Sequence, residues 1–317
     1  MLAENKLVGR TRAGRVVGLV GLAMVLVIGC TVPSENPDGS VPQTAPIGIN
    51  GMAEEPGATG GTVWGADYFG HQLLRFDINT GAIAERYGSL CDTDDVVVAP
   101  DGSLLATCAG DGIVLRVHRD GTSDVLATVG KGVNPIALSP DETAVYVGFG
   151  NGDDDKVIRV PLDGGPTQVV ASGLPILNGF GFGPDGLLYA PTGGVDALLG
   201  NTGGLMSIDV TTGQTRQIPL NFIDDPAKTG LAFAVGVEVG ADGTVYIAQG
   251  VNPEVWAVDP ATGDARLVGR SPFDTADNLV ILSDGRILLS PFLGNGVVVF
   301  TPDGSGGWVL SATNIGG

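Results

Sequence analysis

The chain has 317 residues, with Lys+Arg 16 against Asp+Glu 35, and its formal net charge is −19. Such an acidic protein repels nucleic acid, whose binding depends on basic contacts to phosphate, and it favours a cation or a neutral ligand instead. The 52 Gly and 20 Pro residues, in a chain that is 43% hydrophobic, indicate many short strands joined by tight turns around a sizeable core.

Residues 1–29 have the organisation of an export signal. Four basic residues lie near the start, and the apolar stretch 16–29 that follows is shorter than the roughly 20 residues of a membrane span. The stretch ends in Val27-Ile28-Gly29-Cys30, which resembles the bacterial lipobox. That resemblance implies lipidation of Cys30 and an extracytoplasmic protein anchored in the cell envelope. An ordinary buried Cys beside an ordinary signal is the alternative.

Residues 30–46 continue with Pro, Ser, Asn and Gly and show no apolar period. This composition predicts a flexible tether between the lipid-modified cysteine and the folded domain. We therefore divide the chain into a signal peptide (1–29), a tether (30–46) and a single folded domain (47–317).

A tight turn with Asp before Gly or a similar residue recurs through the folded domain at intervals of roughly forty to sixty residues. The Asp residues of these turns are Asp101, Asp141, Asp185, Asp242 and Asp284. A second, apolar marker occurs six times, at 74–76, 115–117, 158–160, 206–208, 256–258 and 298–300. Four strands per repeat predict an all-β, six-bladed β-propeller with four-stranded blades.

The two ends of the domain each predict a strand of their own blade. Residues 47–58 contain the inner strand of blade 1, and Trp308 to Ala312 form the outer strand of blade 6. The longest connections, 191–204 and 221–232, are expected on the face of the propeller that usually carries ligand sites. The acidic stretch 151–155 lies on the same face, where a solvated turn is the simpler interpretation because calcium-loop spacing is absent.

The remaining cysteines, Cys91 and Cys108, fall near the same end of one predicted hairpin. An exported protein can oxidise them, so a disulfide and two free thiols are both open. The two histidines, His71 and His118, lie on different predicted blades, so the sequence does not favour a Ser-His-Asp hydrolase.

One position repeats seven residues before each turn Asp, where the inner strand begins at the mouth of the channel. Its occupants are Asp94, Asn134, Asn178, Val235 and Asp277. Four of the five carry oxygen donors, and such groups converging on a narrow channel suit a hard cation such as Ca²⁺. The alternative is that Asn and Asp stand there as turn formers that bond local backbone.

The pattern from Asn178-Gly179 to Pro184-Asp185-Gly186 and its repeats over about 47–314 resembles the gluconolactonase/regucalcin family. Its members are six-bladed propellers with Ca²⁺ in the channel. The resemblance implies a calcium-dependent lactone or ester hydrolase, with Asn134 and Asn178 at two metal-ligand positions and Glu54 near a third.

Blade 5 departs from the family pattern, because Val235 stands where a carboxylate should bind the metal and act as general base. We expect Asp277, one blade further on, to supply both roles, with Asp225 as the alternative. The competing function is a non-catalytic propeller that binds a glycan, a small ligand or a protein at the cell surface. Either protein would be a monomer that contacts the membrane only through its lipid.

Overall fold

The computed structural model describes residues 47–58, 60–150, 155–193 and 202–316. The expected signal peptide, Cys30, the tether and positions 151–154 of the acidic stretch lie outside these described residues. No helix in the described ranges is long and apolar enough to cross a membrane.

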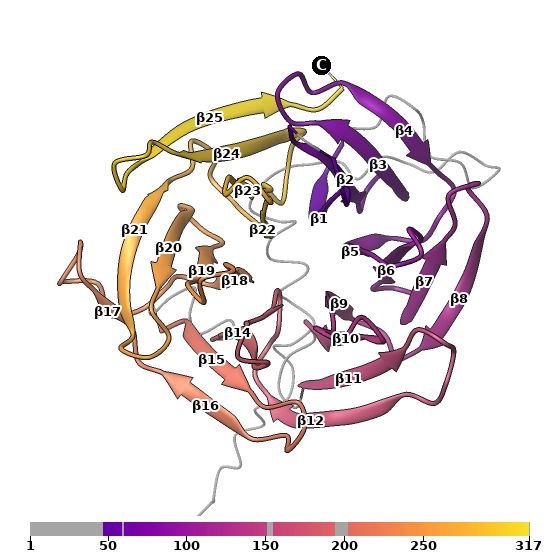
Figure 1. The fold of residues 1–317 in the computed structure, drawn as a ribbon, viewed down its shortest axis with the longest axis horizontal. Helices are drawn as coiled ribbons and strands as arrows, with labels where there is room; N and C mark the ends of the chain where they lie inside the picture. Colours follow the sequence, from indigo (N-terminus) through magenta and orange to yellow (C-terminus); the bar gives the residue numbers. More distant parts are fainter. Residues whose placement is uncertain (1–46, 59, 151–154, 194–201, 317) are drawn as a thin grey trace, which may run out of the picture. The chain divides into compact units, whose positions relative to one another are not determined.

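Twenty-five strands and no helix make up the described residues, arranged in six sheets around a ring (Figure 1). Blade 1 consists of β1 (Ile49–Glu54), β2 (Thr62–Asp67), β3 (Gln72–Asp77) and β4 (Ile83–Tyr87). Blade 2 consists of β5 (Thr93–Val98), β6 (Leu104–Cys108), β7 (Ile113–Val117) and β8 (Ser123–Thr128). Blade 3 consists of β9 (Val133–Leu138), β10 (Ala144–Phe149), β11 (Asp155–Pro161) and β12 (Gln168–Leu174).

The second half of the ring repeats this order. Blade 4 consists of β13 (Gly181–Phe182), β14 (Leu188–Thr192), β15 (Gly204–Ile208) and β16 (Thr215–Ile218). Blade 5 consists of β18 (Ala234–Val239), β19 (Val245–Gln249), β20 (Glu254–Val258) and β21 (Asp264–Arg270), with β17 (Asn221–Phe222) added outside β21. Blade 6 consists of β22 (Leu279–Ile281), β23 (Ile287–Leu289), β24 (Gly296–Pro302) and β25 (Trp308–Asn314). The predicted six-bladed propeller with four-stranded antiparallel blades is confirmed.

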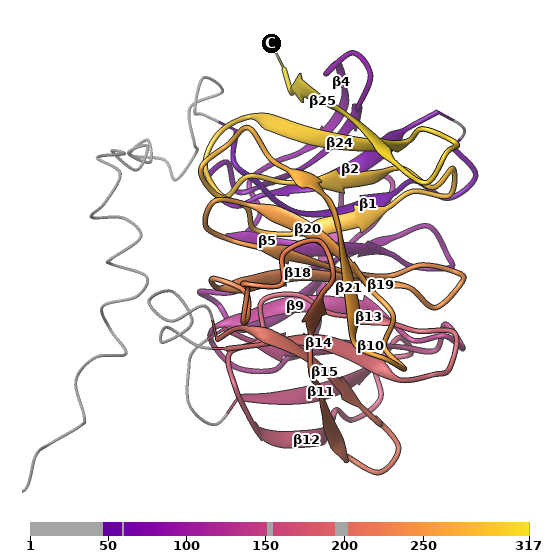
Figure 2. The same ribbon diagram turned by 90° about the vertical axis from the view of Figure 1, so that its left-hand side faces the viewer.

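Seen from the side, the strands run across the thickness of the ring (Figure 2). The core is divided into six apolar clusters, and each cluster joins two neighbouring blades. Trp64 and Trp256, both fully buried, fill two of these interfaces. Large aromatic side chains dominate such interfaces because each buries much apolar area. Every blade therefore depends on both neighbours for its core.

Blade 5 carries the one addition to the regular pattern. The two-residue strand β17 pairs parallel with β21, so the outer edge of this blade is partly covered. Lys228 fixes the connection that follows: its Nζ lies 3.0 Å from Glu254 Oε2 and sits over the rings of Phe222 and Trp256. The long connection after β16 is thus attached to the blade's outer side.

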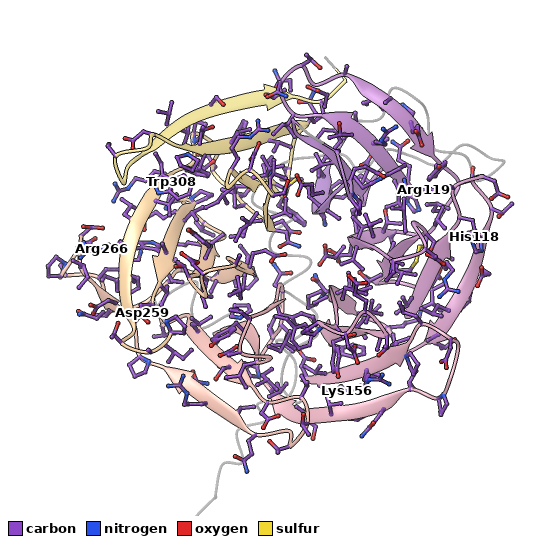
Figure 3. The ribbon with its side chains drawn as sticks, viewed as in Figure 1. His118, Arg119, Lys156, Asp259, Arg266 and Trp308 are labelled. Atoms are coloured by element: carbon purple, nitrogen blue, oxygen red, sulfur yellow. A yellow bond between two sulfur atoms is a disulfide. The ribbon has the colours of Figure 1, made fainter. Side chains whose placement is uncertain are left out.

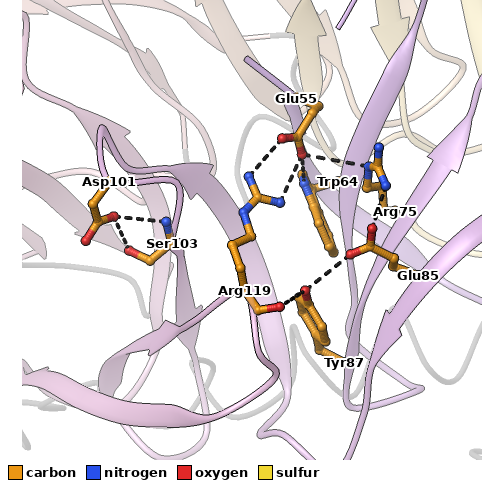
Figure 4. Close-up of polar contacts among 8 residues, drawn as sticks. All are labelled: Glu55, Trp64, Arg75, Glu85, Tyr87, Asp101, Ser103 and Arg119. Carbon is orange, nitrogen blue, oxygen red and sulfur yellow. Dashed lines mark hydrogen bonds and ion pairs between the residues drawn. The ribbon is translucent and has the colours of Figure 1, made fainter. Parts of the chain in front are cut away.

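A polar network ties blade 1 to blade 2 (Figure 4). The Glu55 carboxylate accepts hydrogen bonds from Trp64 Nε1 and from both terminal nitrogens of Arg119, at 2.9 and 3.1 Å. Tyr87 Oη donates to the carbonyl oxygen of Arg119 at 3.0 Å, and the Tyr87 ring stacks on Trp64. The contacts of Arg119 cross from blade 2 to blade 1, so they add directional bonds to an otherwise apolar interface.

The ring closes without exchange of strands between its ends, as the sequence predicts. β1 is the inner strand of blade 1 and β25 is the outer strand of blade 6, so each blade is built from consecutive strands. The seam between these blades is held by a shared apolar cluster and by polar contacts. Gly316 N donates to Gly81 O at 2.9 Å, and Ser290 Oγ donates to Asn50 O at 2.5 Å.

The Sγ atoms of Cys91 and Cys108 are bonded in a disulfide, with the two Cα atoms 5.6 Å apart. Cys91 lies in the connection from β4 to β5, and Cys108 ends β6. The disulfide therefore fixes the approach to the inner strand of blade 2.

Reduction of this disulfide should lower the free energy of unfolding by about 3 kcal/mol. The reason is that it opens the loop between Cys91 and Cys108, which are separated by 17 positions, and so gives the unfolded chain more freedom. Denaturant titration with and without a phosphine reductant measures the change. The double variant Cys91→Ala/Cys108→Ala is the control and should not respond to reductant. Equal stability of the wild type before and after complete reduction would contradict the prediction.

Candidate functional site

Four of the six inner strands share an irregularity at the point where they enter the channel. In β1, the pairing with β2 passes from Ile49↔Asp67 to Met52↔Gly65, so one extra residue bulges out of the inner strand. β5, β9 and β18 bulge at the same position of their blades. A bulge re-aims side chains, and bulges are common beside functional sites. The residues in equivalent bulges are Asn50, Asp94, Asn134 and Val235.

Five polar side chains at this level join in a chain of hydrogen bonds, which we call the channel belt. Its members come from blades 1, 2, 3, 4 and 6 and are Asn50, Asp94, Asn134, Asn178 and Asp277.

Within the channel belt, each amide group donates to a neighbour. Asn50 Nδ2 donates to Asp94 Oδ1 at 3.4 Å, and Asn134 Nδ2 donates to Asp94 Oδ2 at 3.2 Å. Asn134 Nδ2 also donates to Asn178 Oδ1 at 2.8 Å, and Asn178 Nδ2 donates to Asp277 Oδ1 at 3.4 Å. The last contact joins blade 4 to blade 6, because blade 5 supplies only the fully buried Val235. The belt therefore gathers oxygen atoms around one end of the channel.

The structure brings together Asn134, Asn178 and Asp277, three of the four residues that the sequence suggested as metal ligands. It does not bring Glu54 to them. Glu54 ends β1, four positions along the strand from Asn50, and its carboxylate accepts hydrogen bonds from Ser283 N at 2.7 Å and Ser283 Oγ at 2.9 Å. A strand runs through the channel, so its two ends lie at opposite mouths.

Sequence analysis missed Asn50 and gave Asp94 less weight than Glu54. The repeated position is defined by its distance from a turn Asp, and the connection between β1 and β2 has no such Asp. The pair Asn50-Gly51 was nevertheless a usable signal, because it repeats Asn178-Gly179. Asp225, the other suggested carboxylate, comes shortly after β17 on the outer side of blade 5.

Both carboxyl groups of the channel belt are buried, at 7% exposure for Asp94 and 8% for Asp277. Burial, reinforced by the charge of Asp277, raises the pKa of Asp94 well above its usual range. Burial also raises the pKa of Asp277 to about 6, against the lowering effect of its hydrogen bond from Asn178. No Lys or Arg of the described residues forms an ion pair with either carboxylate. Within the part of the chain that the structure describes, neither carboxyl of the belt is therefore neutralised by an ion pair.

Just inside the channel belt lies a cavity of about 170 Å³. Its polar lining includes Asp95, Glu238 and Asn278, and its walls are otherwise largely apolar. Burial raises the pKa of Asp95 to about 7 and that of Glu238 to about 8. Gly51 is required beside them, because a Cβ atom at this position would lie 2.0 Å from Asp95 Oδ1.

Aromatic residues stand on the loops of the same face, between the second and third strands of blades 1 and 6. The ring of Phe69 meets those of Tyr68 and Phe292 edge to face, at centroid distances of 5.3 and 6.1 Å. Burial and the nearby charges of Asp92 and Asp94 raise the pKa of Tyr68 to about 12, so its hydroxyl stays protonated. This face therefore combines acidic groups at the channel with an aromatic rim.

Neither histidine belongs to the channel belt. His118 lies at the periphery of blade 2, where its Nε2 atom is 2.7 Å from Asp124 Oδ1 (Figure 3). His71 occupies the turn between β2 and β3 in the left-handed backbone region, at φ 50°. The groups of the channel belt itself are therefore carboxyls and amides.

No protein-family model and no curated protein sequence matches this chain. Among solved structures, a gluconolactonase from Xanthomonas campestris superposes with a TM-score of 0.61 at 18% identity, over 78% of this chain and 84% of that one. The chain shares the gluconolactonase fold. The similarity extends to a streptogramin B lyase (TM-score 0.59, 17% identity, 85% of this chain and 84% of that one). Virginiamycin B lyase from Staphylococcus aureus also matches (TM-score 0.57, 12% identity, 85% of each chain).

The fold alone does not choose between these activities, since propellers host many functions. A virginiamycin B lyase with one histidine replaced by alanine is catalytically inactive. The channel belt of this chain consists of amides and carboxyls.

The raised pKa values predict how stability depends on pH in the metal-free protein. The folded state holds protons on Asp94, Asp95, Asp277 and Glu238 that the unfolded chain releases near pH 4. The free energy of unfolding should therefore fall as pH rises from about 5 to about 8.5, through the folded-state pKa values. Denaturant titration in the presence of a chelator measures this.

The variant Glu238→Gln is the control for that experiment. An amide cannot ionise, so the free energy of unfolding of this variant should fall less over the same pH interval. The turn residues Asp101, Asp141 and Asp284 have lowered pKa values and lose their contribution only in stronger acid. A wild-type stability that rises between pH 5 and 8.5 would refute the assignment of raised pKa values.

Proposed function

We propose that the protein is a calcium-dependent hydrolase that acts on neutral lactones or esters. The observation that carries the proposal is the channel belt, in which Asn134, Asn178, Asp94 and Asp277 converge at one mouth of the channel. The gluconolactonase fold of the chain is consistent with it. The net charge of −19 favours a neutral substrate over an anionic one.

The donor chemistry of the belt fits calcium. Ca²⁺ takes carboxylate and amide oxygens, and two carboxylates balance its charge. In the described residues no group of three or more His, Cys, Asp or Glu side chains could hold a metal, so the amides are essential to the donor set. Calcium bound there would polarise the carbonyl of a substrate and stabilise the developing negative charge.

Asp277 is the general base in this proposal. Burial raises the pKa of Asp277 in the metal-free protein to about 6, so its carboxylate is ionised at neutral pH and able to accept a proton from water. Asn178 Nδ2 donates to Asp277 Oδ1 and orients the carboxylate. Asn134 bonds both Asp94 and Asn178, so it aligns the two halves of the belt.

Replacing Asp277 by Asn should reduce calcium-dependent hydrolysis of glucono-δ-lactone on the order of 10²-fold or more, because an amide cannot accept the proton. Asn178→Ala should also abolish most of the rise in melting temperature that calcium produces by binding the folded state. Asp284→Asn, an exposed turn residue of the same blade, is the matched control and should retain activity. Hydrolysis by Asp277→Asn at the wild-type rate would exclude Asp277 as the general base.

A non-catalytic binding propeller is the second candidate, and Val235 favours it. At the belt position of blade 5, this fully buried side chain packs between blades 5 and 6. Because of Val235, blade 5 contributes no polar side chain to the channel belt. Calcium binding without turnover of any neutral lactone or ester would select this candidate.

We also propose that the protein is exported and held in the cell envelope by a lipid on Cys30, on the basis of the sequence at 27–30. The variant Cys30→Ser should incorporate no labelled palmitate in bacteria, whereas the wild type should. Asn36→Ser, in the same segment, is a control that should leave labelling unchanged. A mature wild-type N-terminus without lipid, mapped by mass spectrometry, would overturn the proposal.

A further inference from the structure

One buried oxygen of the channel belt has no partner. Asn50 is only 2% exposed, and its side-chain Oδ1 atom forms no hydrogen bond with any described residue. Buried polar atoms in proteins are almost always paired, so an unpaired amide oxygen beside carboxylates needs an explanation.

Turning the amide over does not remove the problem. In the other orientation, Asn50 Oδ1 would face Asp94 Oδ1, which now accepts from Asn50 Nδ2, and the nitrogen would take the unpaired place. A protonated Asp94 can donate to the turned oxygen, but the amide nitrogen is then buried without an acceptor, so one polar atom stays unpaired in either orientation. The unpaired atom therefore reflects the surroundings of the side chain and not the assignment of its oxygen and nitrogen.

The backbone fixes Asn50 in this place. Its carbonyl oxygen accepts a hydrogen bond from Ser290 Oγ of blade 6 at 2.5 Å, and the bulge in β1 directs its side chain to the belt. The same bulge places Asp94 and Asn134 in blades 2 and 3. Asn50 thus occupies the blade 1 position of the repeat that supplies the other belt residues.

We propose that Asn50 Oδ1 is a direct ligand of the cation, and that Asp94 provides a carboxylate ligand beside it. This inference rests on the proposed calcium site and assigns its donors from blades 1 and 2. A cation is the partner that satisfies both the unpaired oxygen and a carboxylate without an ion pair. Glu54 is not among these donors, because it lies at the other end of β1, where its carboxylate accepts hydrogen bonds from Ser283.

The decisive variant is Asn50→Leu, which keeps the size of the side chain and removes the unpaired oxygen. Metal-free Asn50→Leu loses only the 3.4 Å hydrogen bond from Asn50 Nδ2 to Asp94 Oδ1, so it should melt cooperatively at a slightly lower temperature than the wild type. Its calcium affinity, measured by calorimetric titration, should fall at least tenfold, since even indirect partners of metal ligands contribute that much. Calcium affinity within threefold of the wild type would overturn the assignment.

A second variant tests the same atom in the opposite direction. Asn50→Asp adds a carboxylate next to Asp94, so the metal-free protein should melt at a lower temperature at pH 8. Calcium should then raise the melting temperature of this variant more than that of the wild type, because the added charge lies on a ligand. A smaller calcium shift than in the wild type would count against direct contact.

Asn79→Ala is the matched control. Asn79 lies in the turn after β3, where its Nδ2 donates to Gly60 O at 2.6 Å and its Oδ1 accepts from Arg286 at 3.1 Å. It should lower stability and leave calcium affinity unchanged. If calcium binding depends on Asn50 but the protein hydrolyses no lactone or ester, the proposed hydrolase activity is wrong and the assignment of Asn50 as a ligand stands. If hydrolysis depends on calcium but not on Asn50, the hydrolase proposal stands and the assignment of Asn50 is wrong. If the wild type binds no calcium, both are wrong.

Discussion

The narrow axis of the propeller is the constraint on which the rest of the structure depends. Six inner strands converge there, and their backbones approach so closely that some positions tolerate no side chain. A Cβ atom at Gly179 would lie 2.8 Å from Val235 O, and one at Gly236 would lie 2.6 Å from Leu279 N. Polar groups next to these glycines are cut off from bulk water and must satisfy one another or a ligand. The channel belt is the outcome.

The fold could be predicted from the sequence because its repeat is local. Each tight turn joins two strands that pair with each other, so the turn motif and the apolar marker together reveal the blade. The strand β17 could not be predicted in this way. It has two residues and pairs in parallel with β21, and the packing of Lys228 on Trp256 holds its connection in place. Such contacts depend on tertiary structure and leave no periodic trace.

The site could be predicted only where the turn motif gave a fixed origin for counting. Asn134, Asn178, Asp94 and Asp277 share one offset from a turn Asp and do meet in the structure. Blade 1 lacks this origin, and Glu54, which the family resemblance indicates there, lies at the far end of its strand. Position along a strand decides which mouth of the channel a side chain reaches, and without a register a sequence does not specify it.

Closure of the ring and the state of the belt are physically linked. No strand crosses the seam between blades 6 and 1, so apolar packing and single hydrogen bonds carry the closure, and Ser290 Oγ contacts the carbonyl oxygens of both Asn50 and Asn278. These residues adjoin the carboxyls whose pKa values are raised by burial. When the carboxyls lose their protons, repulsion between them acts across the seam. A divalent cation would replace the lost positive charge at the same place. The groups best placed to bind it are therefore also those whose ionisation most affects closure of the ring.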